Sequence, residues 1–491
     1  MPSDILLITS SFEENTGPQY SDKEWVRTKN YQSHYPMGIA YLHAYMEKQG
    51  HAMRMLFLNT HGYEACYAEV EKAIAERAPD ILGLQILTQN RTSSFHILET
   101  VHAAHPNVRL VIGGIHTTAM YKQILQKFPY VVAVLGEGEL TFDELANALK
   151  EGKSIEQIEG IAYFADGQVK VTKPRALIEN LDDLPFPKHE LFFDPERKHS
   201  CILTTRGCPF RCSFCALEQI SRRVHRKRSV DSVIQEIEYL AKAYPNMSMV
   251  WFHDDTLFMD NERVIALCDE IVKRGLNRLQ FVCSARIKPV SEAMVNKLVE
   301  ANFVKVLFGL ESGTDEILRR CHKNITQQDT VETFRLFAKT DIEVITFLIV
   351  GLAGETWETN LNTAKFIKRL QRIKYNYFND IGVLMVYPGT EICRLAIEGG
   401  QITDDYWLTD KPVPFYTVEH SEAELFAMKK VLLDHIALKR IWTVDGFKGQ
   451  WDMIPYVVPF AFSQRDKIAK MVGRRLGIKE KAVATVRPMG E

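Results

Sequence analysis

The stretch Thr204-Thr-Arg-Gly-Cys208-Pro-Phe-Arg-Cys212-Ser-Phe-Cys215 places three cysteines within eight residues. A 4Fe–4S cluster that is fully ligated by protein takes four thiolates. Three thiolates from one short loop leave one iron open, and a metal needs an open position to bind a substrate. No fourth cysteine follows at a ferredoxin-like spacing and no paired CxxC lies elsewhere, which disfavours both a ferredoxin and structural zinc. The motif therefore predicts a 4Fe–4S cluster with one open iron.

The rest of the composition limits the kind of protein that carries this motif. The chain has 491 residues, 46% of them hydrophobic and 25% charged, with a net charge of −2. This length predicts about three domains, and the charge gives no basic field for nucleic acid. The nine cysteines are odd in number and mostly scattered, which is not typical of a disulfide framework. With no evident signal peptide and no apolar run of about 18 residues, we expect a cytoplasmic protein.

Short apolar runs alternate with amphipathic patterns upstream of the motif. This alternation predicts a doubly wound parallel sheet, whose ligands bind outside the carboxyl ends of the strands. The expected strands are 4–9, 53–59, 80–87, 108–114 and 131–137, and the expected helices include 38–49, 67–76 and 93–104. A hairpin is expected at 160–172, around Asp166-Gly167, and an extended linker at 184–188.

A second alternation begins at the motif and predicts a partial parallel barrel. Its expected strands are 201–205, 247–253, 279–285, 303–310, 342–351 and 377–387, with helices such as 229–243 and 261–274. Active sites of such barrels gather at the carboxyl ends of the strands, and the cysteines directly follow the first strand. The expected domains are 1–150, 151–195 for the hairpin and linker, 196–410 for the barrel, and 411–491 for a mostly helical region that includes a helix at 421–441.

CxxxCxxC with an aromatic residue before the last cysteine resembles the radical S-adenosylmethionine (SAM) superfamily over about 200–400. The resemblance implies that Cys208, Cys212 and Cys215 hold the cluster, and that the open iron binds SAM and cleaves it to a 5′-deoxyadenosyl radical. Later strand ends, such as Phe252-His-Asp-Asp-Thr256 and Gly309-Leu-Glu-Ser-Gly313, are also similar to the family. They imply SAM contacts by Phe214, Asp254, Asp255, Ser284, Arg286, Glu311, Ser312 and Gly351.

A doubly wound domain before such a barrel resembles the cobalamin (B12)-binding radical SAM class. The matching stretches are Tyr35–Leu42, Pro79–Leu84, Val111–Thr117 and Leu135–Phe142. Paired glycines allow the backbone to approach a bulky ligand closely, and helix N-termini can receive a phosphate group. The implied cobalamin contacts are Thr88, Gly113, Gly114, His116, Thr117, Gly136 and Gly138. The DxHxxG motif of methyl-transferring corrinoid domains, whose histidine ligates cobalt, is absent; His34 and His61 match it only in part.

Taken together, the resemblance implies an α/β enzyme with a Rossmann-like, B12-binding type domain and a partial (βα)6 radical SAM barrel. The implied activity is cobalamin-dependent methyl transfer to an unactivated carbon of a small-molecule, natural-product or lipid-like substrate. The alternative is cyclisation, ring rearrangement, dehydration or oxidation without methyl transfer. A tRNA-modifying methylthiotransferase is disfavoured, because 1–150 holds only Cys66 where that type carries three cysteines.

Two partners are expected besides the substrate. The resemblance implies a reductant such as flavodoxin or ferredoxin. The segment 465–481 interleaves basic residues with Ile468, Met471, Val472, Leu476 and Ile478, a pattern that can lie on an anionic membrane surface. A solvated terminal helix with one packed face is the alternative for this segment. No catalytic base is assigned, although Tyr387, at the expected end of the sixth strand, is a position of interest.

Overall fold

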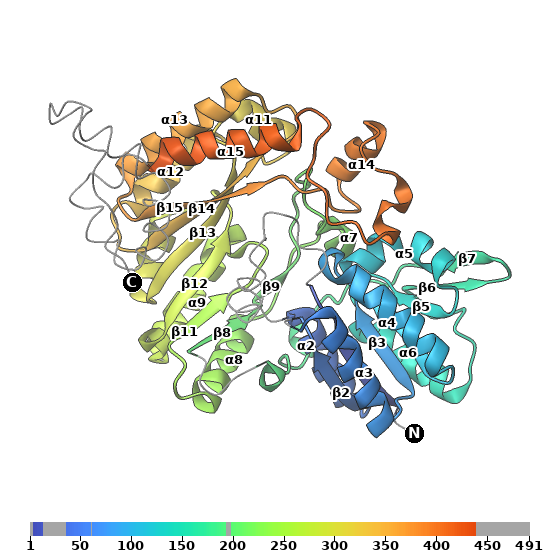
Figure 1. Cartoon of the computed structure of the whole chain (residues 1–491). Coiled ribbons are helices and arrows are strands. Elements are labelled where there is room, and N and C mark those ends of the chain that lie inside the picture. Colours follow the sequence, from blue (N-terminus) through green and yellow to red (C-terminus); the bar gives the residue numbers. More distant parts are fainter. Residues whose placement is uncertain (1–2, 13–35, 60, 193–197, 438–491) are drawn as a thin grey trace, which may run out of the picture. The chain divides into compact units, whose positions relative to one another are not determined.

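Two large sheets, one mostly parallel and one entirely parallel, organise the part of the chain that the computed structural model describes, residues 3–12, 36–59, 61–192 and 198–437 (Figure 1). The N-terminal sheet has the order β2-β1-β3-β4-β5-β6-β7. Its strands are β1 (Asp4–Thr9), β2 (Ala52–Phe57), β3 (Ile81–Gln85), β4 (Arg109–Gly113), β5 (Val131–Val134), β6 (Ile161–Ala165) and β7 (Gln168–Val171). The helices between them are α2 (Met37–Lys48), α3 (Tyr63–Glu76), α4 (Arg91–Ala104), α5 (Ile115–Lys127) and α6 (Glu139–Glu151).

The first five strands pair in parallel, as their apolar runs predict. Strands covered on both faces read as continuous apolar stretches, and Ile5, Leu82 and Ile112 are each at most 1% exposed. The predicted hairpin is also confirmed. It extends this sheet, because β6 pairs antiparallel with β5.

The second sheet is the predicted six-stranded barrel, in the order β15-β14-β13-β12-β11-β8 with every pair parallel. Its strands are β8 (His199–Ile202), β11 (Met249–Phe252), β12 (Gln280–Ala285), β13 (Phe303–Glu311), β14 (Glu343–Val350) and β15 (Tyr377–Val383). The helices are α8 (Val230–Ala243), α9 (Asn261–Lys273), α10 (Glu292–Glu300), α11 (Asp315–Arg320), α12 (Gln327–Phe337), α13 (Trp357–Ile373), α14 (Glu391–Glu398) and α15 (Glu422–Ala437).

Side-chain caps fix where many of these helices begin. Ser229, Asp260, Ser291, Thr326 and Thr356 each accept a hydrogen bond from a backbone N–H in the first turn of the following helix. Such caps satisfy N–H groups that have no partner within the helix and are each worth about 1 kcal/mol. The caps therefore help to fix where these five helices begin.

Two predicted barrel strands end earlier than expected. The first, predicted over 201–205, ends at Ile202, because Thr205–Arg206 (β9) instead pairs antiparallel with Arg226–Lys227 (β10). The sixth, predicted over 377–387, ends at Val383, and Met385 forms an isolated bridge with Phe415. Both chain segments leave the barrel to contact other parts of the molecule.

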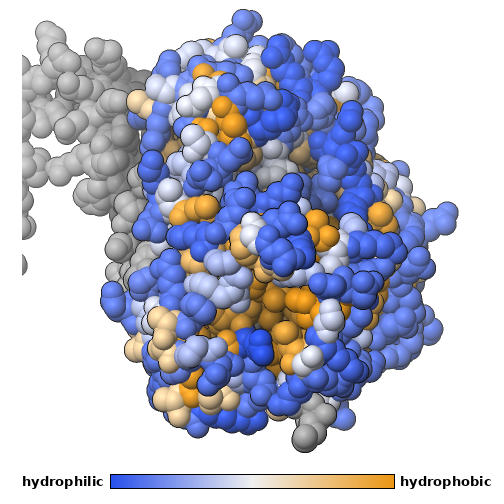
Figure 2. All heavy atoms as spheres, turned by 90° about the vertical axis from the view of Figure 1, so that its right-hand side faces the viewer, coloured by the Kyte–Doolittle hydropathy of each residue, from blue (hydrophilic) through white to orange (hydrophobic). Residues whose placement is uncertain are grey.

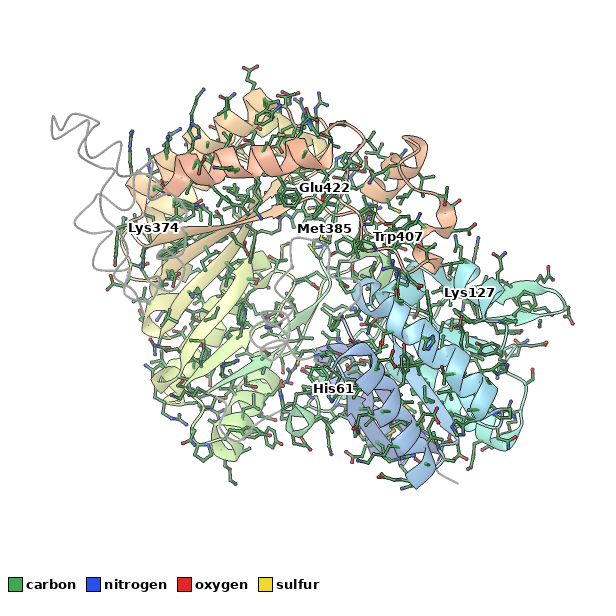
Figure 3. All side chains as sticks on the ribbon, viewed as in Figure 1. His61, Lys127, Lys374, Met385, Trp407 and Glu422 are labelled. Carbon is green, nitrogen blue, oxygen red and sulfur yellow. The ribbon has the colours of Figure 1, made fainter. Side chains whose placement is uncertain are left out.

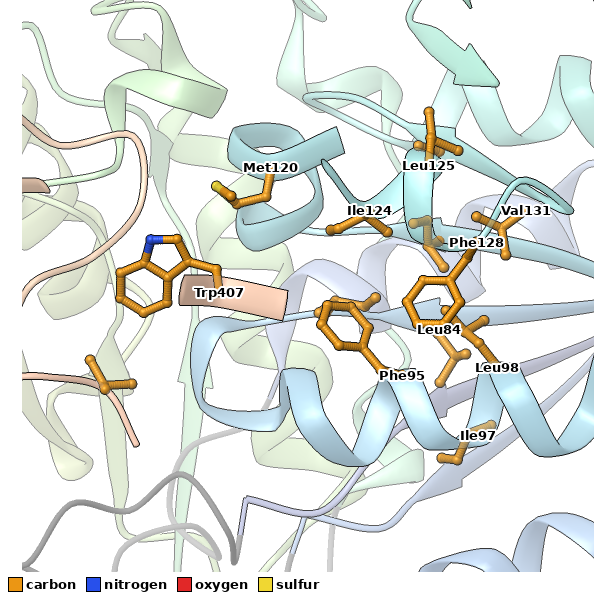
Figure 4. Packing of buried hydrophobic residues seen from close by; sticks show 14 of the residues in the cluster. Leu84, Phe95, Ile97, Leu98, Met120, Ile124, Leu125, Phe128, Val131 and Trp407 are labelled. Carbon is orange, nitrogen blue, oxygen red and sulfur yellow. The ribbon is translucent and has the colours of Figure 1, made fainter. Parts of the chain in front are cut away.

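The segment after the barrel packs onto the N-terminal domain. Trp407, 1% exposed, joins the buried cluster that contains Phe95 and Met120 of α4 and α5 (Figures 3 and 4). The buried Arg91 guanidinium lies 5.5 Å from the centre of the Trp407 ring and donates to the carbonyl oxygen of Thr409 at 3.2 Å. These contacts belong to the compact unit that extends to Leu432.

Contact with a membrane is predicted for the C-terminal part of the chain, and both the apolar surface and the helices bear on this prediction. One face is mostly hydrophilic and has a hollowed area where apolar residues gather (Figure 2). Among the helices described, none is long and apolar enough to cross a membrane. The predicted helix at 421–441 is present as α15 up to Ala437, and the basic segment 465–481 lies outside the described residues.

Candidate active site

The three cysteines of the motif lie on a tight loop between β9 and the short helix α7 (Glu218–Ser221). The backbone N–H of Cys215 donates to the carbonyl oxygen of Cys212 at 3.0 Å, and all nine cysteines of the chain are free thiols. Burial raises the pKa of Cys208 and raises that of Cys215 to about 11. A bound metal offsets such a cost by stabilising the thiolate.

The three thiols of this loop are compatible with a cluster. Among the described residues, no three His, Cys, Asp or Glu side chains are grouped so that they could hold one metal ion. In a cubane cluster each thiolate binds a different iron, so the three sulfurs need not meet at one point. The spacing and free state of Cys208, Cys212 and Cys215 are those that such a cluster requires.

Two aspartates that follow β11 hold the segment that leads into the cysteine loop. Buried Asp254 accepts hydrogen bonds from the backbone of Thr204 at 2.9 Å and the hydroxyl of Thr205 at 2.6 Å. Asp255 accepts from the backbone N–H of Gly207 at 3.0 Å, and burial raises its pKa to about 6. A Cβ on Gly207 would lie 2.2 Å from the carbonyl oxygen of Val224, so only glycine fits here.

Arg286, at the end of β12, contacts the loop directly. Its Nη1 lies 3.6 Å from the Sγ of Cys212. Its guanidinium carbon lies 3.6 Å from the centre of the Phe210 ring, and Nη2 donates to the carbonyl oxygen of Lys323. The side chain of Arg286 is therefore in contact with the cluster-binding loop on two sides.

At the end of β13, Glu311 forms a buried ion pair with Lys323 at 2.7 Å. Gly309 leaves room for this pair, since a Cβ there would lie 2.5 Å from a carboxylate oxygen of Glu311. Glu311 has a φ of 67°, and such strain in a non-glycine residue is typical of functional sites. The neighbouring Ser312 is buried, and its hydroxyl lies 3.2 Å from that of Thr314.

The three remaining predicted SAM contacts lie at this edge of the barrel or on the cysteine loop. Half-buried Ser284 is near the end of β12. The ring of Phe214 lies on the cysteine loop, 5.9 Å from the Nζ of Lys323. Gly351 follows β14, with a φ of 87°, and its N–H donates to buried Glu355 at 2.6 Å. Burial raises the pKa of Glu355 to about 7.

A cavity of about 400 Å³ lies at the carboxyl ends of β1, β3, β4 and β5 and also borders the barrel. From the N-terminal domain its wall includes Gly38, Tyr41, Leu42, Gly83, Leu87, Gly113, Gly114, Ile115, Gly136, Glu137, Gly138 and Glu139. From the barrel side it includes Leu203, Thr205, Arg206, Gly207, Leu217, Ile220, Arg226 and Asp255. Because Gly207 directly precedes Cys208, the cavity reaches the start of the cysteine loop.

Three of the predicted glycines keep this cavity open. A Cβ on Gly113, Gly136 or Gly138 would have no protein atom closer than 3.7 Å, so a side chain on Gly113 or Gly138 would fill the cavity instead of clashing with the fold. Gly136 has in addition a φ of 79°, which favours glycine. Gly114 differs, because its Cβ would lie 2.7 Å from the carbonyl oxygen of Ile86. The part of the cavity wall that these glycines form fits a large ligand that lies against bare backbone.

Three other predicted cobalamin contacts do not line this cavity. The hydroxyl of Thr88 lies 3.1 Å from the Nδ1 of His116, and the Thr117 hydroxyl donates to the carbonyl oxygen of Gly113 at 3.0 Å. His116 is 1% exposed, contacts Trp407, and has its pKa lowered to about 3 by burial. His61 also lies outside the cavity wall, and His34 lies outside the described residues.

An ion-pair cluster beside the cavity was not predicted. Glu137, from the loop Gly136–Gly138, pairs with Arg226 at 2.7 Å and with Arg206 at 3.2 Å. Arg206 also pairs with Glu139 at 2.7 Å and lies 4.8 Å from the centre of the Tyr41 ring. This cluster, here called the clasp, joins the glycine loop to β9 and β10. Glu137 and Arg206 both stand inside quoted motifs, but their pairing depends on the tertiary fold.

Comparison with known proteins agrees with this geometry. Residues 202–367 match the family model of the radical SAM superfamily, and residues 25–146 match that of the B12 binding domain. An uncharacterised methyltransferase, PH0819 of Pyrococcus horikoshii, is 30% identical over 424 residues, which cover 84% of this chain and 90% of that protein. The chain belongs to the family of radical SAM enzymes with a B12-binding domain.

Two further proteins resemble the chain in sequence or in fold. The anaerobic magnesium-protoporphyrin IX monomethyl ester cyclase of Rubrivivax gelatinosus is 28% identical over 68% of this chain and 62% of its own length. The solved structure of the radical SAM methyltransferase TsrM from Kitasatospora setae, with cobalamin and a 4Fe–4S cluster bound, has a TM-score of 0.66 at 20% identity. It covers 82% of this chain and 79% of its own.

Family membership confirms the predicted enzyme class. The two family models match the predicted cofactors, which are a 4Fe–4S cluster, SAM and cobalamin. The predicted fold class, a B12-binding type domain followed by a radical SAM barrel, is confirmed as well. The methyltransferase prediction fits the relatives that carry this name.

Proposed function

We propose that the chain is a cobalamin-dependent methyltransferase that acts on an unactivated carbon of a small-molecule, natural-product or lipid-like substrate. One observation carries the proposal. The cavity at the strand ends of the B12-binding domain shares Thr205, Arg206 and Gly207 with the segment that leads into Cys208. Two cofactor sites are thus joined by three consecutive residues, as sequential chemistry at two cofactors requires.

The residues of the barrel edge would hold the first two cofactors. When bound, the cluster and SAM supply a 5′-deoxyadenosyl radical and cobalamin supplies the methyl group. Cys208, Cys212 and Cys215 would ligate the cluster. Asp255, Ser284, Arg286, Glu311, Ser312, Gly351 and the ring of Phe214 would surround SAM, whereas Asp254 holds Thr204 and Thr205 in place.

The cavity would hold cobalamin against bare backbone. Gly113, Gly136 and Gly138 would make the close contacts, while apolar side chains such as Leu42, Leu217 and Ile220 keep water away. Excluding water strengthens electrostatic interactions and protects reactive intermediates. We assign Thr88, His116 and Thr117 to the packing behind this wall, and Gly114 to the turn that begins α5.

A second function is radical ring closure without methyl transfer. It is favoured by the relative from Rubrivivax gelatinosus that is named as a cyclase. The cofactor sites would be the same in both cases, because the difference lies in what becomes of the substrate radical.

The predicted partners, domain boundaries and location are also part of the proposal. Flavodoxin or ferredoxin would deliver electrons in the cytoplasm, where free thiols persist. The domains would be 1–150, 151–195, 196–410 and 411–491. The peripheral membrane contact predicted for 465–481 concerns a segment that the structure does not describe.

A labelling experiment separates the two functions without knowledge of the substrate. The anaerobically reconstituted enzyme is given reductant, cobalamin and SAM with a trideuterated methyl group. Methyl transfer predicts methylcobalamin that carries the label, together with 5′-deoxyadenosine. Formation of 5′-deoxyadenosine with no label on cobalamin would contradict the methyltransferase and support the alternative.

A further inference from the structure

Arg286, which is expected to contact SAM, also contacts Cys212, a proposed ligand of the cluster. Its Nη1 lies 3.6 Å from the Sγ of Cys212, within hydrogen-bond distance for sulfur. The residue is 5% exposed, so water does little to screen its charge. A hydrogen bond from a charged donor is about twice as strong as one between neutral groups.

The guanidinium is held in this position from three sides. It stacks on Phe210, two residues before Cys212, with 3.6 Å between the guanidinium carbon and the ring centre. Its Nη2 donates to the carbonyl oxygen of Lys323. The segment that carries Lys323 is itself attached to the loop, since the N–H of Ser213 donates to the carbonyl oxygen of Cys321 at 3.2 Å.

The charge environment of Arg286 differs from that of the nearby Lys323. Within the described residues, Arg286 forms no ion pair with a carboxylate, whereas Lys323 is paired with Glu311 at 2.7 Å. Asp255 is a group of opposite sign beside the loop, because it accepts a hydrogen bond at 3.0 Å from the N–H of Gly207, the residue before Cys208. Among the described residues, one cation without a carboxylate partner therefore contacts the cysteine loop, and one carboxylate contacts the residue that precedes it.

We propose that Arg286 sets the reduction potential of the cluster by donating to the Cys212 sulfur. One-electron reduction adds a negative charge to the cluster, and a buried cation stabilises that charge. Hydrogen bonds to the sulfurs and the net local charge are known determinants of cluster potential. Arg286 thus raises the reduction potential of the cluster, so that a flavodoxin-type donor reduces the cluster more easily. Asp255 acts in the opposite direction.

Potentiometric titration of the reconstituted full-length enzyme, monitored by the electron paramagnetic resonance signal of the reduced cluster, tests this role. SAM is left out, so that its binding does not enter the measurement. Arg286→Met should shift the potential to a more negative value, and Arg286→Lys should shift it less, because the charge is kept. Asp255→Asn should shift it to a more positive value.

A matched control removes the same charge two residues away. Lys288 is exposed and paired with Asp329 at 2.9 Å, so Lys288→Met should leave the potential at the wild-type value. If Arg286→Met fails to retain a cluster, Arg286→Lys and Asp255→Asn still carry the test. The inference is overturned if the potentials of these variants equal that of the wild type, even where SAM binding is weakened.

The inference rests on the cluster assignment within the proposed function, and the two fail differently. A wild-type enzyme that assembles no cluster after anaerobic reconstitution would contradict both. A wild-type cluster whose potential is insensitive to Arg286 and Asp255 would contradict only the tuning role.

Discussion

Gly113 ends β4 at the cavity, and apart from its chain neighbours a Cβ on this residue would have no protein atom closer than 3.8 Å. Gly113→Val would place a branched side chain in the volume proposed for cobalamin. We expect the affinity for cobalamin to fall at least about tenfold, equivalent to about 1.4 kcal/mol, with little change in the melting temperature of the cofactor-free protein. Absorbance titration of the protein with cobalamin measures the effect.

Gly382 provides the matched control for this change. It lies within β15, has no positive φ, and has no neighbour of its Cβ closer than 3.9 Å. Gly382→Val should therefore bind cobalamin with wild-type affinity. Equal affinities of Gly113→Val and wild type would show that the ligand does not occupy this part of the cavity.

Glu355 makes stability depend on pH. Burial raises its pKa from 4.5 to about 7, so the folded state retains a proton that the unfolded state has released. The contribution of Glu355 to the free energy of unfolding is fully present below about pH 4.5 and is lost as the pH rises through about 7, a difference of roughly 3 kcal/mol. We expect the wild type to lose stability relative to Glu355→Gln between pH 5 and pH 8.

Melting curves of the two proteins across this range provide the measurement. Asp255 titrates in both proteins, so its effect cancels in the difference between their melting temperatures. A difference in melting temperature between wild type and Glu355→Gln that stays constant with pH would contradict the assignment of this titration to Glu355.

At the residue scale, the sequence predicts those sites whose residues lie close together along the chain. Cys208, Cys212 and Cys215 can be singled out because three thiols on one loop are informative without a fold. Tyr41 lies within a matching stretch and Arg226 lies in none, and neither is among the predicted contacts, although both line the cavity. His116 stays a prediction: it follows the glycine turn in sequence, but its ring contacts Trp407 and it does not line the cavity.

At the scale of elements, the clasp joins the glycine loop to β9 and β10. Removing one partner of a buried ion pair costs about 3–5 kcal/mol, because a charge is left unpaired. Glu137 and Arg226 are each 8% exposed on their side chains, and Arg206 keeps Glu139 as a partner. We therefore expect Glu137→Ala to destabilise by about 3 kcal/mol.

Hydrogen–deuterium exchange locates this effect. Exchange in Glu137→Ala should be faster in β9 and β10, where the clasp is attached. Glu218→Ala, which removes the exposed partner of Arg223, should change stability by less than about 0.5 kcal/mol. Unchanged exchange in β9 and β10 of Glu137→Ala would mean that the clasp does not hold these strands.

Strands and helices are largely predictable here, because buried parallel strands form continuous apolar runs and Ser, Thr or Asp caps mark the helix starts. The strand ends are less so. The sequence Leu203-Thr-Thr205 is as apolar and β-branched as a strand, yet the barrel ends at Ile202. The carboxylate of Asp254 takes the N–H groups of Thr204 and Thr205 instead of a partner in the barrel sheet, and that is a tertiary effect.

At the scale of the whole molecule, the order of the two domains predicts the two cofactor types but not how their sites meet. The cavity shared by Gly113 and Gly207 and the packing of Trp407 into the N-terminal core join residues far apart in sequence. Neither follows from periodicity or spacing, because both depend on how the two sheets are packed within one unit.

We propose that one chain holds a cluster through three cysteines and cobalamin in the adjoining cavity. Iron, sulfide and corrinoid analysis after anaerobic reconstitution tests this proposal most directly, with Cys212→Ala prepared in parallel. We expect about four irons and one cobalamin per wild-type chain, and cobalamin but neither an intact cluster nor SAM cleavage in the variant. A wild-type protein that binds no iron or no corrinoid, or a variant that still cleaves SAM, would contradict it.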